Sequence, residues 1–350
     1  MDVDLRSMSG LRERLLGSPE VLDGPGLARV LRRGDELLRI RAARALGRHP
    51  EERASALLIE LLTDPVPGVR RAAARNLGRR GIDEGLGEAF ALERSNTVLL
   101  ALAEARVRCG QVTADVIADL ERAILVSFET PRGERVPEEA IGLGVAELAA
   151  GLEMALSEDA PDIEEPSGLL NLAARGQLED LETIQGSRRS AGRRGESARL
   201  LAMGHNGDPR FVDTLIVALS RMDLDPSRAF AHRRGSALSL GRIGAPTTAP
   251  SLVRALEVEA LEHEGHPGAG LGVQYPVRAV ILWALGELQA APAVLASYLG
   301  DLQGSALGGF HLPAMGALWK SGELARPHLE RVARGQGEAG LSARAVLARL

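Results

Sequence analysis

The chain has 350 residues and a formal net charge of −5, so its overall charge does not point to a polyanionic partner. Its one cysteine, Cys109, excludes an internal disulfide and a cysteine-based zinc cage. Residues 1–10 lack the pattern of a signal peptide and no apolar run is long enough to span a membrane, so we expect a cytoplasmic protein. Apolar residues make up 45% of the chain and aromatic residues only 3%, with no sustained alternation of strand formers. The predicted fold class is therefore all-α.

Apolar periodicity and turn residues divide the chain into helical hairpins, each with a helix A and a helix B. Helix A is predicted at 36–48, 68–80, 96–109, 139–150, 167–175, 193–204, 228–241, 276–287 and 309–321. Helix B is predicted at 51–63, 83–94, 111–126, 151–157, 177–185, 209–221, 246–261, 290–300 and 323–334. We expect Gly81, Gly207 and Gly244 to end A helices, because glycine tolerates the positive φ of a helix end.

One phrase recurs along the chain: an apolar residue and an arginine, small residues, and then Leu-Gly. Its fullest copy runs from Val69-Arg70 to Leu77-Gly78, with Asp64-Pro65 before it. Weaker copies start at Leu38-Arg39, His232-Arg233 and Val277-Arg278. A repeat every 30 to 47 residues, roughly, is typical of stacked helical hairpins. We expect the Leu-Gly pair to close helix A, and the arginines Arg39, Arg70, Arg233 and Arg278 to anchor adjacent repeats.

This phrase resembles the HEAT repeat, in a short, Leu-Gly-ended form similar to that of bacterial HEAT-like proteins and phycobilin lyase subunits. The likeness is good at 34–94 and 193–300 and degenerate at 95–190. It implies one right-handed α-solenoid over residues 1–350, with about nine hairpins, outer A helices and inner, concave B helices. Its expected parts are a cap at 1–33, regular repeats at 34–126, degenerate repeats with an acidic insertion at 127–186, regular repeats at 187–336 with a Gly-rich insertion at 262–274, and a cap at 337–350.

Charge differs between the two predicted helix layers in the N-terminal half. The A helices carry many arginines: Arg39, Arg41, Arg44, Arg48, Arg70, Arg71, Arg75, Arg79, Arg80, Arg106 and Arg108. The B helices are mainly acidic. Two interpretations stay open: the charges neutralise one another between helices, or the B layer is an acidic groove for a basic protein or peptide. The second predicts a non-catalytic interaction scaffold whose partner-binding residues are Glu60, Glu84, Glu88, Asp115, Asp119, Glu179, Asp180 and Glu182.

Nucleic acid is a competing partner for the arginine-rich layer. The densest basic cluster is Arg188-Arg189 with Arg193-Arg194, and HEAT-like DNA glycosylases hold duplex DNA in a basic concave groove. Here the concave layer is predicted to be acidic, and Trp283 and Trp319 lie on A helices, where packing is expected. Without interleaved aromatics there is no platform for base stacking, which disfavours nucleic acid.

Enzymatic function is the alternative from another class, either a lyase-like subunit or a glycosylase-like DNA-repair protein. HEAT-like hydroxylases bind two irons through several His-Glu pairs, whereas this chain has one such pair, in His263-Glu264-Gly265-His266. We predict a solvated loop there, with no metal and no cofactor. No nucleophile elbow or phosphate-binding loop occurs, and Cys109 at the end of a helix A is expected to be a structural thiol.

Overall fold

The computed structural model describes residues 24–49, 52–110, 193–221, 226–263, 277–300 and 311–350, and every regular element in these ranges is a helix. We call residues 24–110 the first array and 193–350 the second array. The first array contains α2 (Gly24–Arg33), α3 (Glu36–Leu46), α4 (Glu52–Glu60), α5 (Pro67–Arg79), α6 (Leu86–Leu92) and α7 (Asn96–Arg108). The second array contains α12 (Arg193–Asn206), α13 (Val212–Leu219), α14 (Pro226–Ile243), α15 (Ala249–His263), α16 (Val277–Glu287), α17 (Pro292–Ser297), α18 (His311–Ser321), α19 (Arg326–Ala333) and α20 (Glu338–Leu347).

These helices confirm the all-α fold class and the solenoid of stacked hairpins. Each described A helix lies within two or three residues of its predicted bounds, and most B helices join a short 3-10 turn, such as Pro209–Phe211 before α13. The helix predicted at 83–94 is shorter, because α6 begins only after the turn that contains Gly85 and ends where Glu93 is extended. The helix α15 runs to His263, into the segment predicted as a Gly-rich insertion, so the prediction of a loop at His263 is wrong. The helices predicted at 111–126, 139–150, 151–157, 167–175 and 177–185 lie outside the described residues.

Successive A helices pack directly on one another, and the Leu-Gly phrase makes this possible. The leucine, as at Leu77, is fully buried. The Leu-Gly pair closes α3 as we expected, with Gly47 as the C-cap. In α5, however, Gly78 lies within the helix, where a Cβ atom would come 2.5 Å from the Cα of Ala105 in α7. Gly286 in α16 meets Ala317 in α18 in the same way, at 2.6 Å. The phrase therefore encodes a close crossing of consecutive A helices.

In α5, α12 and α14 a second glycine, three residues after the first, follows the end of the A helix. Gly81, Gly207 and Gly244 have φ angles of 67°, 74° and 72°, so the prediction that they end helices is confirmed. Only glycine adopts this left-handed conformation without strain, which lets the chain turn sharply into helix B.

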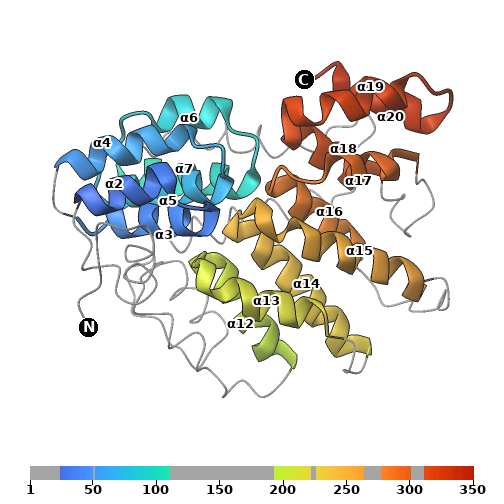
Figure 1. Ribbon diagram of the computed structural model, residues 1–350, viewed down its shortest axis with the longest axis horizontal. Helices are drawn as coiled ribbons and strands as arrows, with labels where there is room; N and C mark the ends of the chain where they lie inside the picture. Colours follow the sequence, from blue (N-terminus) through green and yellow to red (C-terminus); the bar gives the residue numbers. More distant parts are fainter. Residues whose placement is uncertain (1–23, 50–51, 111–192, 222–225, 264–276, 301–310) are drawn as a thin grey trace.

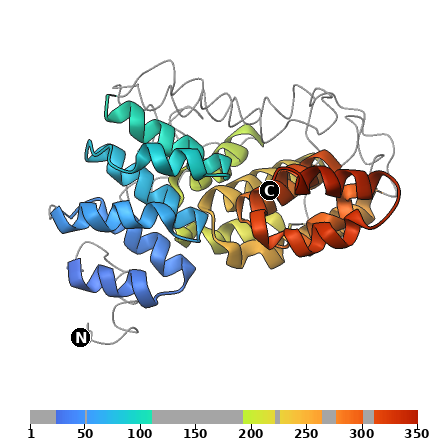
Figure 2. The same cartoon turned by 90° about the horizontal axis from the view of Figure 1, so that it is seen from above.

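The two arrays lie side by side, the first in blue to cyan and the second in yellow-green to red (Figure 1). The view from above shows the same arrangement (Figure 2). At their boundary the amide of Gly68, in the first turn of α5, donates to the carbonyl oxygen of Gly244 at 3.0 Å. A Cβ atom on Gly68 would come 2.2 Å from the carbonyl oxygen of Ile243. Stacking in a solenoid joins only neighbouring repeats, so this contact between distant repeats is an additional feature of the fold.

Arginines of the first array cover the C-terminal ends of A helices in the second array. The Arg71 side chain donates to the carbonyl oxygens of Gly204, at 3.0 Å, and of Arg242. Arg44 donates to the carbonyl oxygen of Asn206, and Arg94 to that of Trp319 at 3.0 Å. The last carbonyls of a helix have no partner within the helix and carry a partial negative charge. Guanidinium groups satisfy both needs, so these arginines belong to the interior of the molecule.

Candidate functional site

The acidic residues predicted for partner binding fall into two groups. Glu60 ends α4, Glu84 lies in the turn before α6, and Glu88 lies in α6; all three are exposed. None of the three side chains has a hydrogen bond or ion pair to another residue in the described ranges. The others, Asp115, Asp119, Glu179, Asp180 and Glu182, lie outside the described residues.

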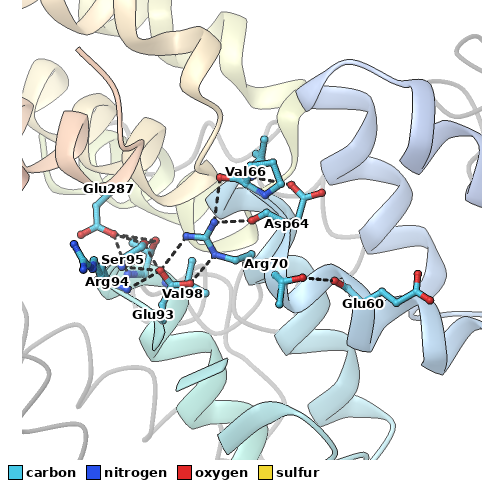
Figure 3. Close-up of polar contacts among 12 residues, drawn as sticks. Glu60, Asp64, Val66, Arg70, Glu93, Arg94, Ser95, Val98 and Glu287 are labelled. Atoms are coloured by element: carbon cyan, nitrogen blue, oxygen red, sulfur yellow. Dashed lines mark hydrogen bonds and ion pairs between the residues drawn. The ribbon is translucent and has the colours of Figure 1, made fainter. Parts of the chain in front are cut away.

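Two of the four anchoring arginines make the contact that the repeat phrase predicts. Arg39 forms an ion pair of 2.5 Å with Asp64, and Arg70 forms one of 2.7 Å with Glu93. In both cases an A helix reaches the acidic residue that precedes the next A helix. Figure 3 shows Arg70 between Glu93 and the segment of Asp64, whose carbonyl oxygen accepts from Arg70 at 2.7 Å. Adjacent repeats are thus tied by ion pairs with low exposure. The anchoring role of Arg233 and Arg278 stays a prediction.

The environment of Asp64 shows how closely these anchors are packed. Burial raises the pKa of this carboxyl above its usual value, although the amide of Val66 and the guanidinium of Arg39 favour its charged form. The amide of Val66 donates to it at 2.8 Å, which orders the turn into α5. The acidic residues of these anchors serve the fold and are not available to a partner.

The A helices are rich in arginine, but most of these arginines are not exposed to solvent. Arg41, Arg70 and Arg71 are buried, and only Arg48, Arg79 and Arg108 of the predicted set are exposed. The reason is that the A helices pack against each other, against B helices and, in the first array, against the second array. Some of these arginines are neutralised by acidic residues of neighbouring helices, as Arg39 and Arg70 are. The carboxylates of Glu60, Glu84 and Glu88 form no such pair in the described ranges.

The tryptophans considered for base stacking pack against the core. Trp283 and Trp319 are half-buried against it. The Lys320 ammonium lies 5.6 Å from the centre of the Trp283 ring, and the Arg94 guanidinium lies 5.3 Å from that of Trp319. In the basic cluster, Arg188 and Arg189 lie outside the described residues, and Arg193 and Arg194 start α12. The described residues therefore offer no exposed aromatic platform at these two positions.

At the positions considered for covalent or metal chemistry, the described ranges contain no arranged set of reactive or metal-binding side chains. Cys109 is half-buried, and burial, followed by the nearby Asp83 carboxylate, raises the pKa of its thiol, which disfavours the reactive thiolate. His263 ends α15, and His266 lies outside the described residues. No group of three or more histidine, cysteine or acidic side chains that could hold a metal occurs in the described ranges. None of the helices there is long and apolar enough to cross a membrane.

A cluster of arginines at the boundary between the arrays was not foreseen from the sequence. Asp208, which precedes the turn before α13, is fully buried. Its carboxylate lies 3.8 Å from the Arg44 side chain and 3.2 Å from that of Arg210. Burial opposes its ionisation, but the guanidinium groups of Arg44 and Arg41 outweigh this and hold the pKa of Asp208 below its usual value. Arg41 and Arg44 are far in sequence from Asp208 and Arg210, so only the packing of the arrays could reveal the cluster.

Comparison with known proteins identifies one part of the chain. Residues 24–108, which span α2 to α7, match the family model described as HEAT repeats. The comparison with curated proteins gives no match.

Proposed function

Since the chain is a HEAT-repeat protein, we propose that it is a non-catalytic interaction scaffold that binds a basic protein or peptide on the B layer. HEAT repeats commonly serve as protein-interaction scaffolds. We call the exposed residues Glu60, Glu84, Glu88 and Leu92 of the first array the acidic B surface. By sequence, the proposal extends to Asp115, Asp119, Glu179, Asp180 and Glu182.

One observation carries this proposal: the acidic and basic charges of the first array are used differently. Several arginines of the A layer bind an acidic residue of the next repeat, as Arg70 does, or carbonyl oxygens at helix ends, as Arg71 does. Glu60, Glu84 and Glu88 face solvent without a partner in the described ranges. A surface with one sign of charge attracts partners of the opposite sign and speeds their encounter.

An exposed apolar side chain supplements the charge. Leu92 is 79% exposed at the end of α6, and it lies four residues after Glu88, so the two share one face of the helix. An apolar anchor beside carboxylates suits a segment that presents both an apolar and a basic face. The expected partner is therefore a basic amphipathic protein segment.

The test measures partner binding by wild-type protein and by the charge reversal Glu84→Lys with Glu88→Lys. Partners captured by the wild type are identified, purified and then titrated against each variant. We expect the reversal to slow association and weaken binding, and wild-type affinity to fall as salt rises, because exposed charges steer the encounter. Leu92→Ala should weaken the same complex mainly by speeding dissociation.

Arg108→Glu is the matched control, because Arg108 is exposed at the end of the A helix α7. Reversals at Arg71 are unsuitable, since its side chain is buried between the arrays. The control should bind the partner as the wild type does. Unchanged binding by the Glu84 and Glu88 reversal would contradict the proposal. So would duplex DNA binding tighter than roughly 10⁻⁶ M at physiological salt, which exceeds ordinary non-specific contact.

A further inference from the structure

The last two helices of the second array leave an apolar side chain exposed. Leu341, in α20, is 43% exposed, whereas Ala343 and Val346 of the same helix are buried in the core. Arg344 lies about one helical turn after Leu341 and is also exposed, so the two side chains share one side of α20. The Arg344 guanidinium donates to the carbonyl oxygen of Ala333, at the end of α19, at 2.6 Å. We call residues 326–350 the α19–α20 hairpin.

The exposed charge of the α19–α20 hairpin is mainly positive. From Pro327 to Leu350, where every residue is described, the only exposed acidic residue is Glu330. The exposed basic residues are Arg331, Arg334, Arg344 and Arg349. Arg331 and Arg334 make no hydrogen bond or ion pair within the described ranges. The hairpin therefore combines an apolar side chain with positive charge, which is the chemistry expected of a partner of the acidic B surface.

The outward side of α6 carries the opposite charge. Between Gly81 and Leu92 the exposed charged residues are all acidic: Asp83, Glu84 and Glu88. One side of the helix exposes four residues at helical spacing: Gly87, Glu88, Ala91 and Leu92. No atom lies within 4 Å of the position that a Cβ atom on Gly87 would take. A second helix can therefore approach this side of α6 closely.

We propose that the α19–α20 hairpin of a second copy of this chain binds to the acidic B surface. The inference rests on the proposed function and names the partner of that surface. The carboxylates of Glu84 and Glu88 attract the exposed arginines of the hairpin, which speeds the encounter of two copies. Leu92 and Leu341 then lose contact with water, which favours the complex.

Within one copy the two surfaces do not meet. Leu92 is 79% exposed and Leu341 is 43% exposed in the same chain. Figure 1 shows α6 in the upper left and α20 in the upper right, and the view from above also separates the cyan helices from the red ones (Figure 2). The contact therefore joins two copies through a different surface of each. Two copies that exchange it form a closed pair, and a contact that does not close extends from copy to copy.

The size of the contact predicts that association is weak. The helix α6 has seven residues and α20 has ten. Two helices this short cover less than the roughly 800 Å² per partner of a stable interface of standard size. We therefore expect self-association that develops only as the protein concentration rises.

Analytical ultracentrifugation of the full chain tests the inference over a range of protein and salt concentrations. We expect the wild type to be monomeric when dilute and to form dimers or longer assemblies as its concentration rises. Added salt should reverse this association, because it screens the charges that attract the two surfaces. Leu341→Ala should weaken the association at every salt concentration, because it removes an apolar contact.

Two charge reversals test which surfaces meet. Glu84→Lys with Glu88→Lys should raise the concentration needed for association by about tenfold or more, because like charges then face each other. Arg331→Glu with Arg334→Glu should have the same effect. An equimolar mixture of the two double variants should associate again, since the basic α6 of one faces the acidic hairpin of the other. Arg108→Glu, at an exposed position at the end of α7, should behave as the wild type does.

Thermal melts establish that each variant folds, as expected for substitutions at exposed positions. The inference is overturned if the wild type stays monomeric at every concentration, if both double variants associate as it does, or if their mixture stays monomeric. A monomeric wild type whose Glu84 and Glu88 reversal still weakens the binding of another basic partner would contradict this inference alone. A reversal that changes neither self-association nor partner binding would contradict the proposed function as well.

Discussion

At the scale of single residues, the described structure separates positions that hold the fold from positions that face solvent. Leu77, in the repeat phrase, lies on the A helix α5 and is fully buried in the hydrophobic core. Glu88, eleven positions later, is exposed on α6, and its side chain makes no hydrogen bond or ion pair in the described ranges. Hydrophobic pattern alone assigns both positions, because burial of apolar side chains is the main driving force of folding.

Replacing these two residues with alanine should have very different effects on stability. Leu77→Ala should lower the free energy of unfolding by about 2–5 kcal/mol, because it removes buried methyl groups and leaves a cavity. Glu88→Ala should change it by about 0.5 kcal/mol or less, as is usual at the surface. Urea denaturation of both variants measures the difference. Equal losses would mean that the face assignment of the repeat is wrong.

At the scale of helices, the spacing between consecutive A helices depends on glycine. Gly78 lets α5 approach the backbone of α7, as Gly286 does for α16 and α18. The repeat phrase therefore specifies contact between elements, in addition to the structure of one element. Gly87 provides a contrast within the first array, since it lies in α6 and no atom comes within 4 Å of the position that a Cβ atom would take.

The two glycines should respond to alanine with opposite signs. Gly78→Ala should destabilise the protein by about 1–3 kcal/mol, because a methyl group would force two packed helices apart. Gly87→Ala should stabilise it by about 0.5–1 kcal/mol, because alanine favours the helix and nothing obstructs its side chain. Thermal or urea melts of both variants check this. A stable Gly78→Ala protein would show that the A helices can separate at little cost.

At the scale of the whole molecule, the arrays are joined by buried polar contacts as well as by helix ends. Glu287, at the end of α16, has 0% exposure and forms an ion pair with Lys320. It also accepts a hydrogen bond from the Ser95 hydroxyl, just before α7, at 2.5 Å (Figure 3). The amide of Thr97, in the first turn of α7, donates to the same carboxylate at 3.1 Å. One carboxylate therefore connects consecutive A helices of the second array to the first array.

Removing the charge of Glu287 should weaken the connection between the arrays. Glu287→Gln leaves the Lys320 ammonium buried without its counterion, so we expect a loss of about 3–5 kcal/mol in the free energy of unfolding. Amide hydrogen exchange should show reduced protection in α7 and in α16, which belong to different arrays. The control is Glu323→Gln, which breaks the exposed pair of Glu323 with Arg326 and should have little effect. Loss of protection confined to α16 would contradict a role in joining the arrays.

Local sequence pattern specifies the helical class, the positions of the described A helices and the anchoring role of Arg39 and Arg70. These features are local: apolar spacing, glycine at helix ends, and the acidic residues Asp64 and Glu93 placed before α5 and α7. The sequence pattern also identified the exposed carboxylates: Glu60 and Glu88 lie away from the apolar face of their helices, and Glu84 lies in the turn before α6.

Only the tertiary structure decided which arginines are available to a partner. Arg71 and Arg108 look alike in the sequence, but one donates to helix ends of the second array and the other is exposed. The cluster of arginines around Asp208 has the same origin, since Arg44 of the first array meets Asp208 of the second. The physical reason is that the orphan carbonyls at helix ends attract guanidinium groups wherever packing brings them together, and a repeat pattern records only contacts between neighbours.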